Sequence, residues 1–349
     1  MPSTTHDAIT AALATGPAGS RAPTGFSADA ARASTAAAFA DRVDDIDAGR
    51  LDFPLPGGGR TAARFRALTA VAADDLCVAR LVEGHVDATA ILAELDGPRA
   101  GAGERWGVWA AEPPGEGLTA TRTDQGWTLN GLKPYCSGAH SCTHALVTAT
   151  AGEDRRLFAV ATADPGCRPV PGTWRALGMA GSDTPDVRFD GVHAVAVGGV
   201  REYLTRPGFQ HGGIGVAACW YGGALAVAEA LRTAAGRRED VLTDAHMGAV
   251  DMRLHAAGAV LAQAAVEIDL DPDDTGGTAR LRSLRTRAFV ESVCADVLTH
   301  VGRATGAGPL CRDERHARTA ADLTVYIRQH HAERNLAELG GLVARKEHS

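Results

Sequence analysis

Aromatic residues are scarce in this chain of 349 residues, where Phe, Trp and Tyr together make up 5%. An excess of positive charge is also lacking, because 35 Lys and Arg stand against 42 Asp and Glu for a net charge of −7. Non-specific nucleic-acid binding needs a basic surface, so this balance argues against that class. No apolar run approaches the ~20 residues of a membrane-spanning helix, and the N-terminus lacks the pattern of a signal peptide. We therefore expect a cytoplasmic protein without a membrane span.

The cysteine content argues against a disulfide framework. Seven cysteines are an odd number, and most of them lie in apolar contexts. This usage is typical of reduced, buried thiols in a cytoplasm. The remaining composition, 45% hydrophobic and 22% charged, is that of an ordinary globular protein. At ~100–200 residues per domain, the length predicts two or three domains.

The first predicted domain, 1–102, is helical. An alanine-rich stretch at 30–43 contains no helix breaker, and Pro and Gly residues at 54–59 then interrupt it. Apolar residues recur at helical spacing over 61–95. Because Glu and Gly stand together at 83–84, we expect a break there that divides this stretch into two helices.

The second predicted domain, 103–205, is a small β-domain. Side chains alternate between polar and apolar in several short segments, and Pro or Gly follows every 8–12 residues, as between the strands of a sandwich or barrel. The expected strands are 119–123, 127–131, 145–150, 157–163 and 187–193.

The third predicted domain, 206–349, is helical again. Four long segments with short connections predict an antiparallel four-helix bundle. These segments are 214–233, 244–268, 278–301 and 312–339. The fold class is therefore α+β, with an N-terminal helical domain, a small middle β-domain and a C-terminal bundle.

Three segments carry motifs that agree with this domain order. Residues 126–139 read GWTLNGLKPYCSGA, residues 176–192 read ALGMAGSDTPDVRFDGV, and residues 111–117 read AEPPGEG. The first is similar to the G-x-x-L-N-G-x-K-x-[WYF]-x-[ST] hairpin of the acyl-CoA dehydrogenase superfamily. The second resembles that family's L-G-M-x-G-S strand pair, and the third resembles a degraded form of its T-E-P-x-x-G-S-D segment. The resemblance covers 30–340.

The resemblance implies an FAD cofactor. A flavin ring needs an apolar or aromatic plate against its face, and donors aimed at N5 and O4. On the family pattern Tyr135 supplies the plate, and the hydroxyl or backbone N–H of Ser137 donates to N5, with Cys136 between them. A strand runs along the pyrimidine edge of the ring. Its residues are Val108, Trp109, Ala110 and Ala111.

The resemblance also implies an oligomer. In the family, an arginine from a neighbouring subunit holds the pyrophosphate just after the first bundle helix, and here that stretch contains Arg237 and Arg238. The competing interpretation is a solvated cation at a helix end. A turn after the third bundle helix, at His300 and Gly302, would press backbone against the cofactor. A shared site of this kind implies a homodimer or homotetramer.

The reaction implied is α,β-desaturation of an acyl thioester, bound to coenzyme A or an acyl-carrier protein. A base takes the α-proton, and a hydride passes to flavin N5. Electrons then pass to an electron-transfer flavoprotein or to oxygen. The family's catalytic glutamate is missing, because the chain contains no Y-E-G-T turn and no carboxylate at 209–215. Candidate bases are His211, His330 and His331, since a histidine pKa lies near operating pH.

Two other interpretations stay open. Flavin-dependent monooxygenases with this fold use a histidine near the flavin, and their hairpin often ends in Ser-Gly, as Ser137 and Gly138 do here. A flavin-free binding scaffold would explain the absence of hydroxyls at Ala111 and Gly117. A zinc site can also be drawn from Cys136, His140, Cys142 and His144, but these residues overlap the flavin hairpin. We expect no metal.

Overall fold

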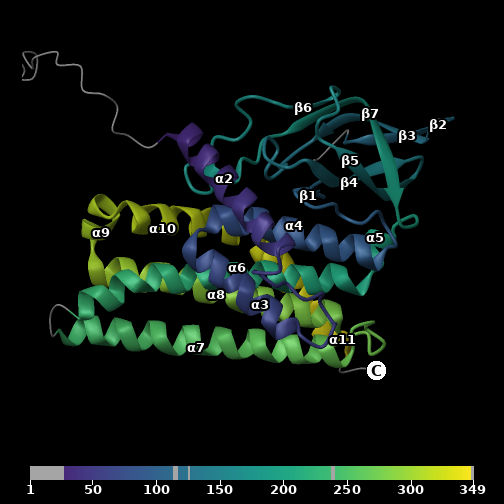
Figure 1. Ribbon diagram of the computed structural model, residues 1–349. Coiled ribbons are helices and arrows are strands. Elements are labelled where there is room, and N and C mark those ends of the chain that lie inside the picture. Colours follow the sequence, from purple (N-terminus) through teal and green to yellow (C-terminus); the bar gives the residue numbers. More distant parts are fainter. Residues whose placement is uncertain (1–26, 113–116, 125, 237–239, 347–349) are drawn as a thin grey trace, which may run out of the picture.

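The computed structural model describes residues 27–112, 117–124, 126–236 and 240–346. Helices come first, strands follow, and a long helical region ends the chain, so the fold is mixed helix and sheet as expected (Figure 1). In Figure 1 the strands gather above α4, and α7 lies on the side of the molecule farthest from them.

From residue 27 onward, the described part of the N-terminal region contains three helices, and none of them breaks at 83–84. They are α2 (Ala28–Asp47), α3 (Thr61–Asp74) and α4 (Leu76–Glu94). The break expected at 83–84 is wrong, because it falls at Asp75. The Asp75 side chain accepts hydrogen bonds from the backbone N–H groups of Cys77 (2.8 Å) and Val78 (3.0 Å), which caps the start of α4. Glu83 therefore lies inside a continuous helix.

The described residues of the β-domain form seven strands. They are β1 (Trp106–Trp109), β2 (Thr119–Thr123), β3 (Gly126–Lys133), β4 (His144–Ala151), β5 (Asp154–Ala161), β6 (Cys167–Pro169) and β7 (Val187–Val197). The β2–β3 hairpin pairs Ala120 with Leu129 in antiparallel register. Pairings run β4–β2–β3–β7–β5 and return from β5 to β4, and the β2–β4 link is the single pair Thr119 and Thr150.

β1 lies outside this ring of pairings and is an edge strand. It pairs in parallel with β4 on one side, with Val108 opposite Leu146. No other strand of the described ranges pairs with its second side. The sequence did not predict β6, which is short and pairs with β7.

In the described ranges, three long helices follow the β-domain. After the short α5 (Glu202–Thr205) come α6 (Pro207–Ala235), α7 (Val241–Leu270) and α8 (Ala279–Thr305). The fourth predicted helix, 312–339, is wrong as one helix, because the structure divides this part of the chain. Its pieces are α9 (Ala307–Arg312), α10 (Glu314–Tyr326), the 3-10 turn η2 (Ile327–Gln329) and α11 (Ala332–Lys346). The backbone is extended at His330, with φ −83° and ψ 124°, which ends η2.

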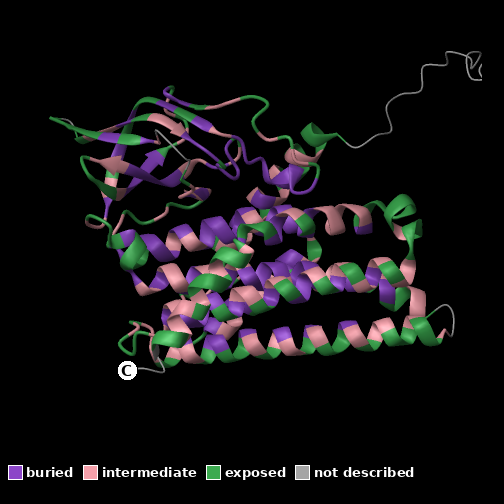
Figure 2. Cartoon of the chain, turned by 180° about the vertical axis from the view of Figure 1, so that it is seen from behind, coloured by how far each residue is buried: buried purple, intermediate pink, exposed green. Residues whose placement is uncertain are grey.

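Burial is greatest where α4 meets β1 and where α4 and α6 meet the neighbouring helices, and α7 is mostly exposed along its outer side (Figure 2). By length and composition α6 could cross a membrane, with a mean hydropathy of 1.5 over its most apolar window. The expectation that no segment approaches this composition was therefore wrong. In the folded chain 67% of that window is buried, as in the core helix of a globular protein.

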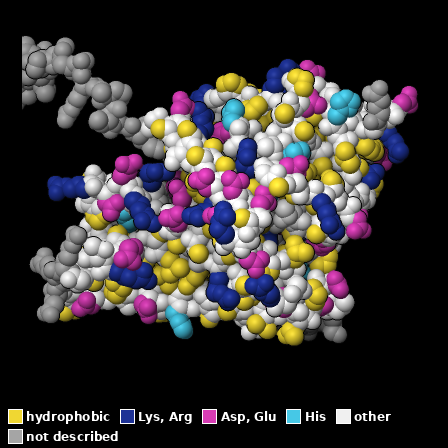
Figure 3. Space-filling model, viewed as in Figure 1, with side chains coloured by type: hydrophobic (Ala, Val, Ile, Leu, Met, Phe, Trp, Pro, Cys, Tyr) yellow, Lys and Arg dark blue, Asp and Glu magenta, His cyan; other side chains and the backbone are white. Residues whose placement is uncertain are grey.

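The described surface carries charges of both signs. In Figure 3, Lys and Arg side chains are interspersed with Asp and Glu side chains over the face shown. All seven cysteines are free, and Cys311 is the exposed one, whereas the other six are buried. The predicted burial of most thiols is thus confirmed.

Candidate functional site

A cavity of about 610 Å³ lies between the β-domain and the helices, and we call it the interdomain cavity. Its lining from the β-domain comes from β1, the segment after β3 and the loop around η1 (Ala180–Ser182). Its lining from the helices comes mainly from α4, α10 and η2. Lining residues that the sequence predicted for the site are Val108, Ala110, Ala111, Tyr135, Ser137 and His331.

The free edge of β1 faces α4 and this cavity. The backbone N–H of Trp106 donates to Nδ1 of His85 on α4 (3.2 Å), and burial lowers the pKa of His85 to about 4, so this ring stays neutral and accepts. Strand geometry repeats every two residues, so the Val108 N–H points to the same side. A Cβ on Gly84 would lie 4.0 Å from that nitrogen. The lining of the cavity therefore includes a strand edge with hydrogen-bonding groups available.

Tyr135 lies at the mouth of the cavity, two residues beyond β3. Its side chain is 62% exposed although the residue lines the cavity. Its backbone has φ +56°, a left-handed conformation that is unusual for a bulky residue. Next to it, the Cys136 N–H donates to the Pro185 carbonyl (2.9 Å) and fixes the turn. The ring is thus presented to the cavity by a strained but anchored backbone.

Ser137 is buried and keeps a free donor. The amides on either side of it, Cys136 and Gly138, donate to Pro185 and Ser182, but the Ser137 N–H has no hydrogen-bond partner among the described residues. A buried amide without a partner costs free energy unless a ligand or water accepts from it. The Ser137 hydroxyl accepts from Thr184 Oγ1 (3.2 Å). This amide is the clearest sign that a ligand with an acceptor atom fits here.

Two of the residues predicted to contact the flavin from the hairpin and its neighbouring strand do not line the cavity. Trp109 is 1% exposed, and its indole Nε1 donates to the Ser137 carbonyl (2.9 Å), so it supports the segment from behind. Cys136 is fully buried, and its thiol lies 3.3 Å from the Lys133 carbonyl oxygen. Strand alternation explains the case of Trp109, because its neighbour Val108 in β1 faces the cavity instead.

The three histidines predicted as bases lie in three different places. His331 lines the interdomain cavity. Its backbone N–H donates to Asn335 Oδ1 in the first turn of α11 (2.8 Å). His330 is buried and lines a different groove of about 1090 Å³ between α7, α8 and α11. His211 is buried on α6 with Nε2 3.0 Å from the Pro272 carbonyl oxygen. Neither His330 nor His211 lines the interdomain cavity.

The predicted cofactor contacts on α8 are not found in this cavity. His300 and Gly302 lie inside α8 rather than in a turn, and His300 Nδ1 is 2.9 Å from His246 Nδ1 on α7. Arg237 and Arg238 lie outside the described residues. The residues considered as a zinc site do not come together, because His140 pairs with Asp183 and His144 stacks on Trp106. Among the described residues, no group of three potential ligands is arranged to hold a metal ion.

α4 supplies charged lining that the sequence did not single out. Arg80 NH1 donates to Glu83 Oε2 (2.6 Å), and both side chains are largely buried. Burial raises the pKa of Glu83 from 4.5 to about 7, against the opposing influence of Arg80. Asp87, one turn further on, also lines the cavity. These three residues follow helical spacing, which is the signal that could have placed them on one face.

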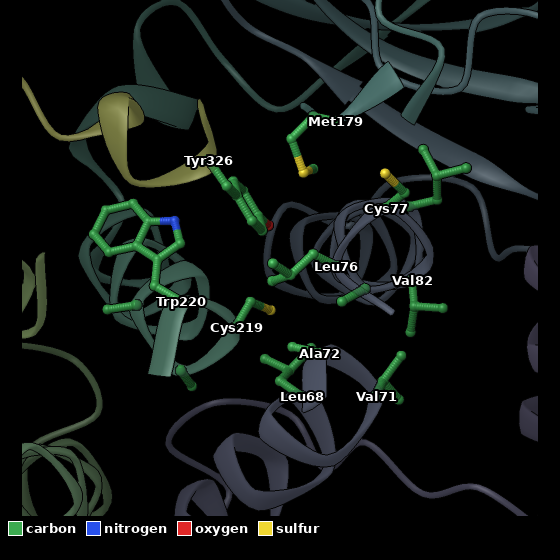
Figure 4. Packing of buried hydrophobic residues seen from close by; sticks show 14 of the residues in the cluster. Leu68, Val71, Ala72, Leu76, Cys77, Val82, Met179, Cys219, Trp220 and Tyr326 are labelled. Carbon is green, nitrogen blue, oxygen red and sulfur yellow. The ribbon is translucent and has the colours of Figure 1, made fainter. Parts of the chain in front are cut away.

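Tyr326, at the end of α10, closes the cavity on the side of α6. Its ring is 1% exposed and meets Trp220 edge-on, with centroids 6.4 Å apart. Figure 4 shows Tyr326 between Met179 of the β-domain and Cys219 of α6. Burial raises the pKa of the Tyr326 hydroxyl and of the Cys219 thiol, and the hydroxyl has no hydrogen-bond partner among the described residues. This side of the cavity is rigidly packed.

A comparison with solved structures identifies the fold. TdsC, a dibenzothiophene monooxygenase from Paenibacillus sp. A11-2, matches with a TM-score of 0.73 and 17% identity over 91% of this chain and 97% of its own. Butyryl-CoA dehydrogenase from Megasphaera elsdenii matches at 0.70 and 18% over 82% and 83%. KijD3, solved with FMN and dTDP-3-amino-2,3,6-trideoxy-4-keto-3-methyl-D-glucose, matches at 0.70 and 19% over 93% and 95%.

The chain therefore has the acyl-CoA dehydrogenase fold, as the motifs of its hairpin predicted. Scans against protein-family models and curated proteins found no match. At these identities the similarity defines the fold, and the chemistry has to be argued from the chain's own residues.

Proposed function

We propose that the protein is a flavin-dependent oxidoreductase, with its reaction in the interdomain cavity. The observation that carries the proposal is the Ser137 N–H, a buried donor without a described partner in the lining beside Tyr135. A bound flavin would supply a two-electron acceptor or donor. Tyr135 would pack on the ring system, Ser137 would donate to its polar edge, and the β1 edge at Val108 would hydrogen-bond to the pyrimidine side.

The cavity favours a monooxygenase over acyl-thioester desaturation. Charged and polar groups of α4, Arg80, Glu83 and Asp87, line its helical side. Burying an acyl chain against such groups would remove them from water without replacing their hydrogen bonds, which is costly. His331 is the histidine of the cavity lining, and it could hold or deliver a proton beside the ring. We propose either FMN or FAD as the cofactor.

Desaturation is the second candidate, because one carboxylate has a suitable pKa. Glu83 lines the cavity, and its pKa of about 7 matches that of a general base at neutral pH. In this reaction Glu83 would take the α-proton of an acyl thioester. Its hydrogen bond from Arg80 would have to be exchanged for the substrate during the step.

Reconstitution tests the proposal. The purified protein is titrated with FMN and FAD. We expect bound flavin, with an absorption band at ~450 nm, to stay with the protein when free flavin is removed. Tyr135→Ala should weaken flavin binding, whereas the exposed control Asp190→Asn should not. Absence of binding for both flavins would disprove the proposed function.

The two reactions are then distinguished with the loaded protein. Anaerobic bleaching by acyl-CoA indicates desaturation. Oxygen consumption by the chemically reduced flavoprotein, coupled to product formation, indicates the monooxygenase.

A further inference from the structure

We infer that the α4 end of the interdomain cavity binds the ammonium group of an amine-bearing substrate, with Asp87 as its anionic partner. The inference rests on the proposed function, because it assigns the substrate class of the same cavity. It depends on how the carboxylates of α4 are satisfied. Among the described residues Glu83 has a cationic partner in contact, whereas Asp87 has none.

The Asp87 carboxylate accepts no hydrogen bond from any described residue and forms no ion pair with one. Its Oδ1 is buried without a partner. An ionised carboxylate can accept up to about four hydrogen bonds, and leaving it unsatisfied away from water is costly. Asp87 is therefore the carboxylate of this lining that lacks a donor among the described residues.

A described cation that interacts electrostatically with Asp87 already has other partners. The charge of Asp87 raises the pKa of Arg64 on α3, against the larger effect of burial. The Arg64 guanidinium itself donates to the Val86 carbonyl through NH2 (3.0 Å) and to the Pro54 carbonyl through NH1 (3.3 Å). Its side chain is not among those that line the cavity. Arg64 lowers the cost of burying Asp87 without occupying its oxygens.

The packing of α6 leaves space for this carboxylate. A Cβ at Gly212 would lie 2.6 Å from Asp87 Oδ1, which is closer than real Cβ atoms come. A glycine at 212 therefore leaves room for the Asp87 carboxylate between α4 and α6, and Asp87 also lines the cavity. Tyr203, also in the lining, is close enough to Asp87 that the two interact electrostatically.

The Asp87 side of this end fits an ammonium, because the neighbouring Arg80 guanidinium is paired with Glu83 rather than with Asp87. An ammonium presents three N–H donors, which match Asp87, the tyrosine hydroxyl of Tyr203 and Glu83. A substrate carboxylate would meet Asp87 and Glu83 with like charge. A metal ion lacks support, since no group of three potential ligands occurs in the described part of the chain.

Calorimetric binding of three matched probes tests the inference. Butylammonium, butanol and butyrate are titrated into the protein with and without bound flavin. We expect butylammonium to bind at least about tenfold more tightly than the other two. Equal binding of the three probes, or a preference for butyrate, would overturn the inference. Flavin titration of the same sample reports separately on the proposed function.

Variants then assign the contact to Asp87. Asp87→Asn keeps the shape and removes the charge, so it should lower butylammonium affinity about tenfold and leave butanol binding unchanged. Asp190→Asn, an exposed carboxylate on β7, is the matched control. If Asp87→Asn fails to fold, Gly212→Ala displaces the same carboxylate and should show the same selective loss. Wild-type affinity for butylammonium in a folded variant would contradict the assignment.

Discussion

Arg80 donates to Glu83 across 2.6 Å inside the lining of a cavity, one helical turn apart on α4. Burial of the pair leaves Glu83 harder to ionise than a free glutamate, and its pKa rises from 4.5 to about 7. Near neutral pH the charge of this carboxylate is therefore sensitive to pH.

The raised pKa of Glu83 predicts a specific pH dependence of stability. Between pH 4.5 and about 7 the native state keeps a proton that the unfolded state has lost. The free energy of unfolding therefore receives a contribution from Glu83 that decreases as pH rises through this window. Glu83→Gln removes it, so the difference between wild type and variant should change with pH. Chemical denaturation at a series of pH values measures this, and a constant difference would contradict the prediction.

Docking of the β-domain on α10 predicts a severe effect at Gly178. A Cβ there would lie 2.1 Å from the Ala321 carbonyl oxygen. Gly178→Ala should therefore destabilise the protein by ~1–3 kcal/mol. The control is Gly248→Ala on the exposed side of α7, where a Cβ meets nothing within 4 Å. That variant should stabilise by ~0.5–1 kcal/mol because alanine favours the helix. Thermal unfolding of both variants checks the opposite signs.

Thiol exposure predicts stoichiometry with a thiol reagent. Cys311 on α9 is exposed and the other six cysteines are buried. Burial also raises the pKa of buried thiols such as Cys77 and Cys294, which lowers their thiolate fraction. We expect one thiol to react rapidly in the native protein and seven after unfolding. Rapid reaction of a second native thiol would show that a buried site opens.

Neighbouring histidines should differ in their effect on turnover. His331 lines the interdomain cavity, whereas His330 lines the groove between α7, α8 and α11. If His331 transfers a proton during the reaction, His331→Ala should lower kcat ~10²-fold or more. His330→Ala should act on stability instead, because its side chain is buried elsewhere. Steady-state kinetics and unfolding of both variants separate these roles, and equal loss of kcat would reject the assignment.

Local sequence patterns predicted the strands better than the helix breaks. The alternation of side chains predicted β2 with its observed bounds, 119–123. The break before α4 was misplaced because Gly84 was taken as a helix breaker. The capping side chain of Asp75 determines where the helix begins. The division after Tyr326 depends on tertiary contacts, such as the ion pair of Arg328 with Glu291 on α8, which no local pattern contains.

The sequence predicted the part of the candidate site that a single segment forms. The hairpin motif placed Tyr135 and Ser137 at the cavity. Asp87 was missed, because its importance depends on a missing partner and on Gly212, 125 positions along the chain. A relationship between two distant helices becomes visible only when they are packed together.

At Tyr135, a left-handed backbone conformation that lowers stability coincides with an aromatic side chain at the mouth of the cavity. Glycine adopts φ +56° without the steric cost that a tyrosine Cβ meets there. A search for heat-resistant variants would therefore favour Tyr135→Gly, and each such gain would remove the ring from the entrance. Under the proposed function, the tyrosine at this site combines a less favourable main chain with an aromatic surface on which the flavin would pack.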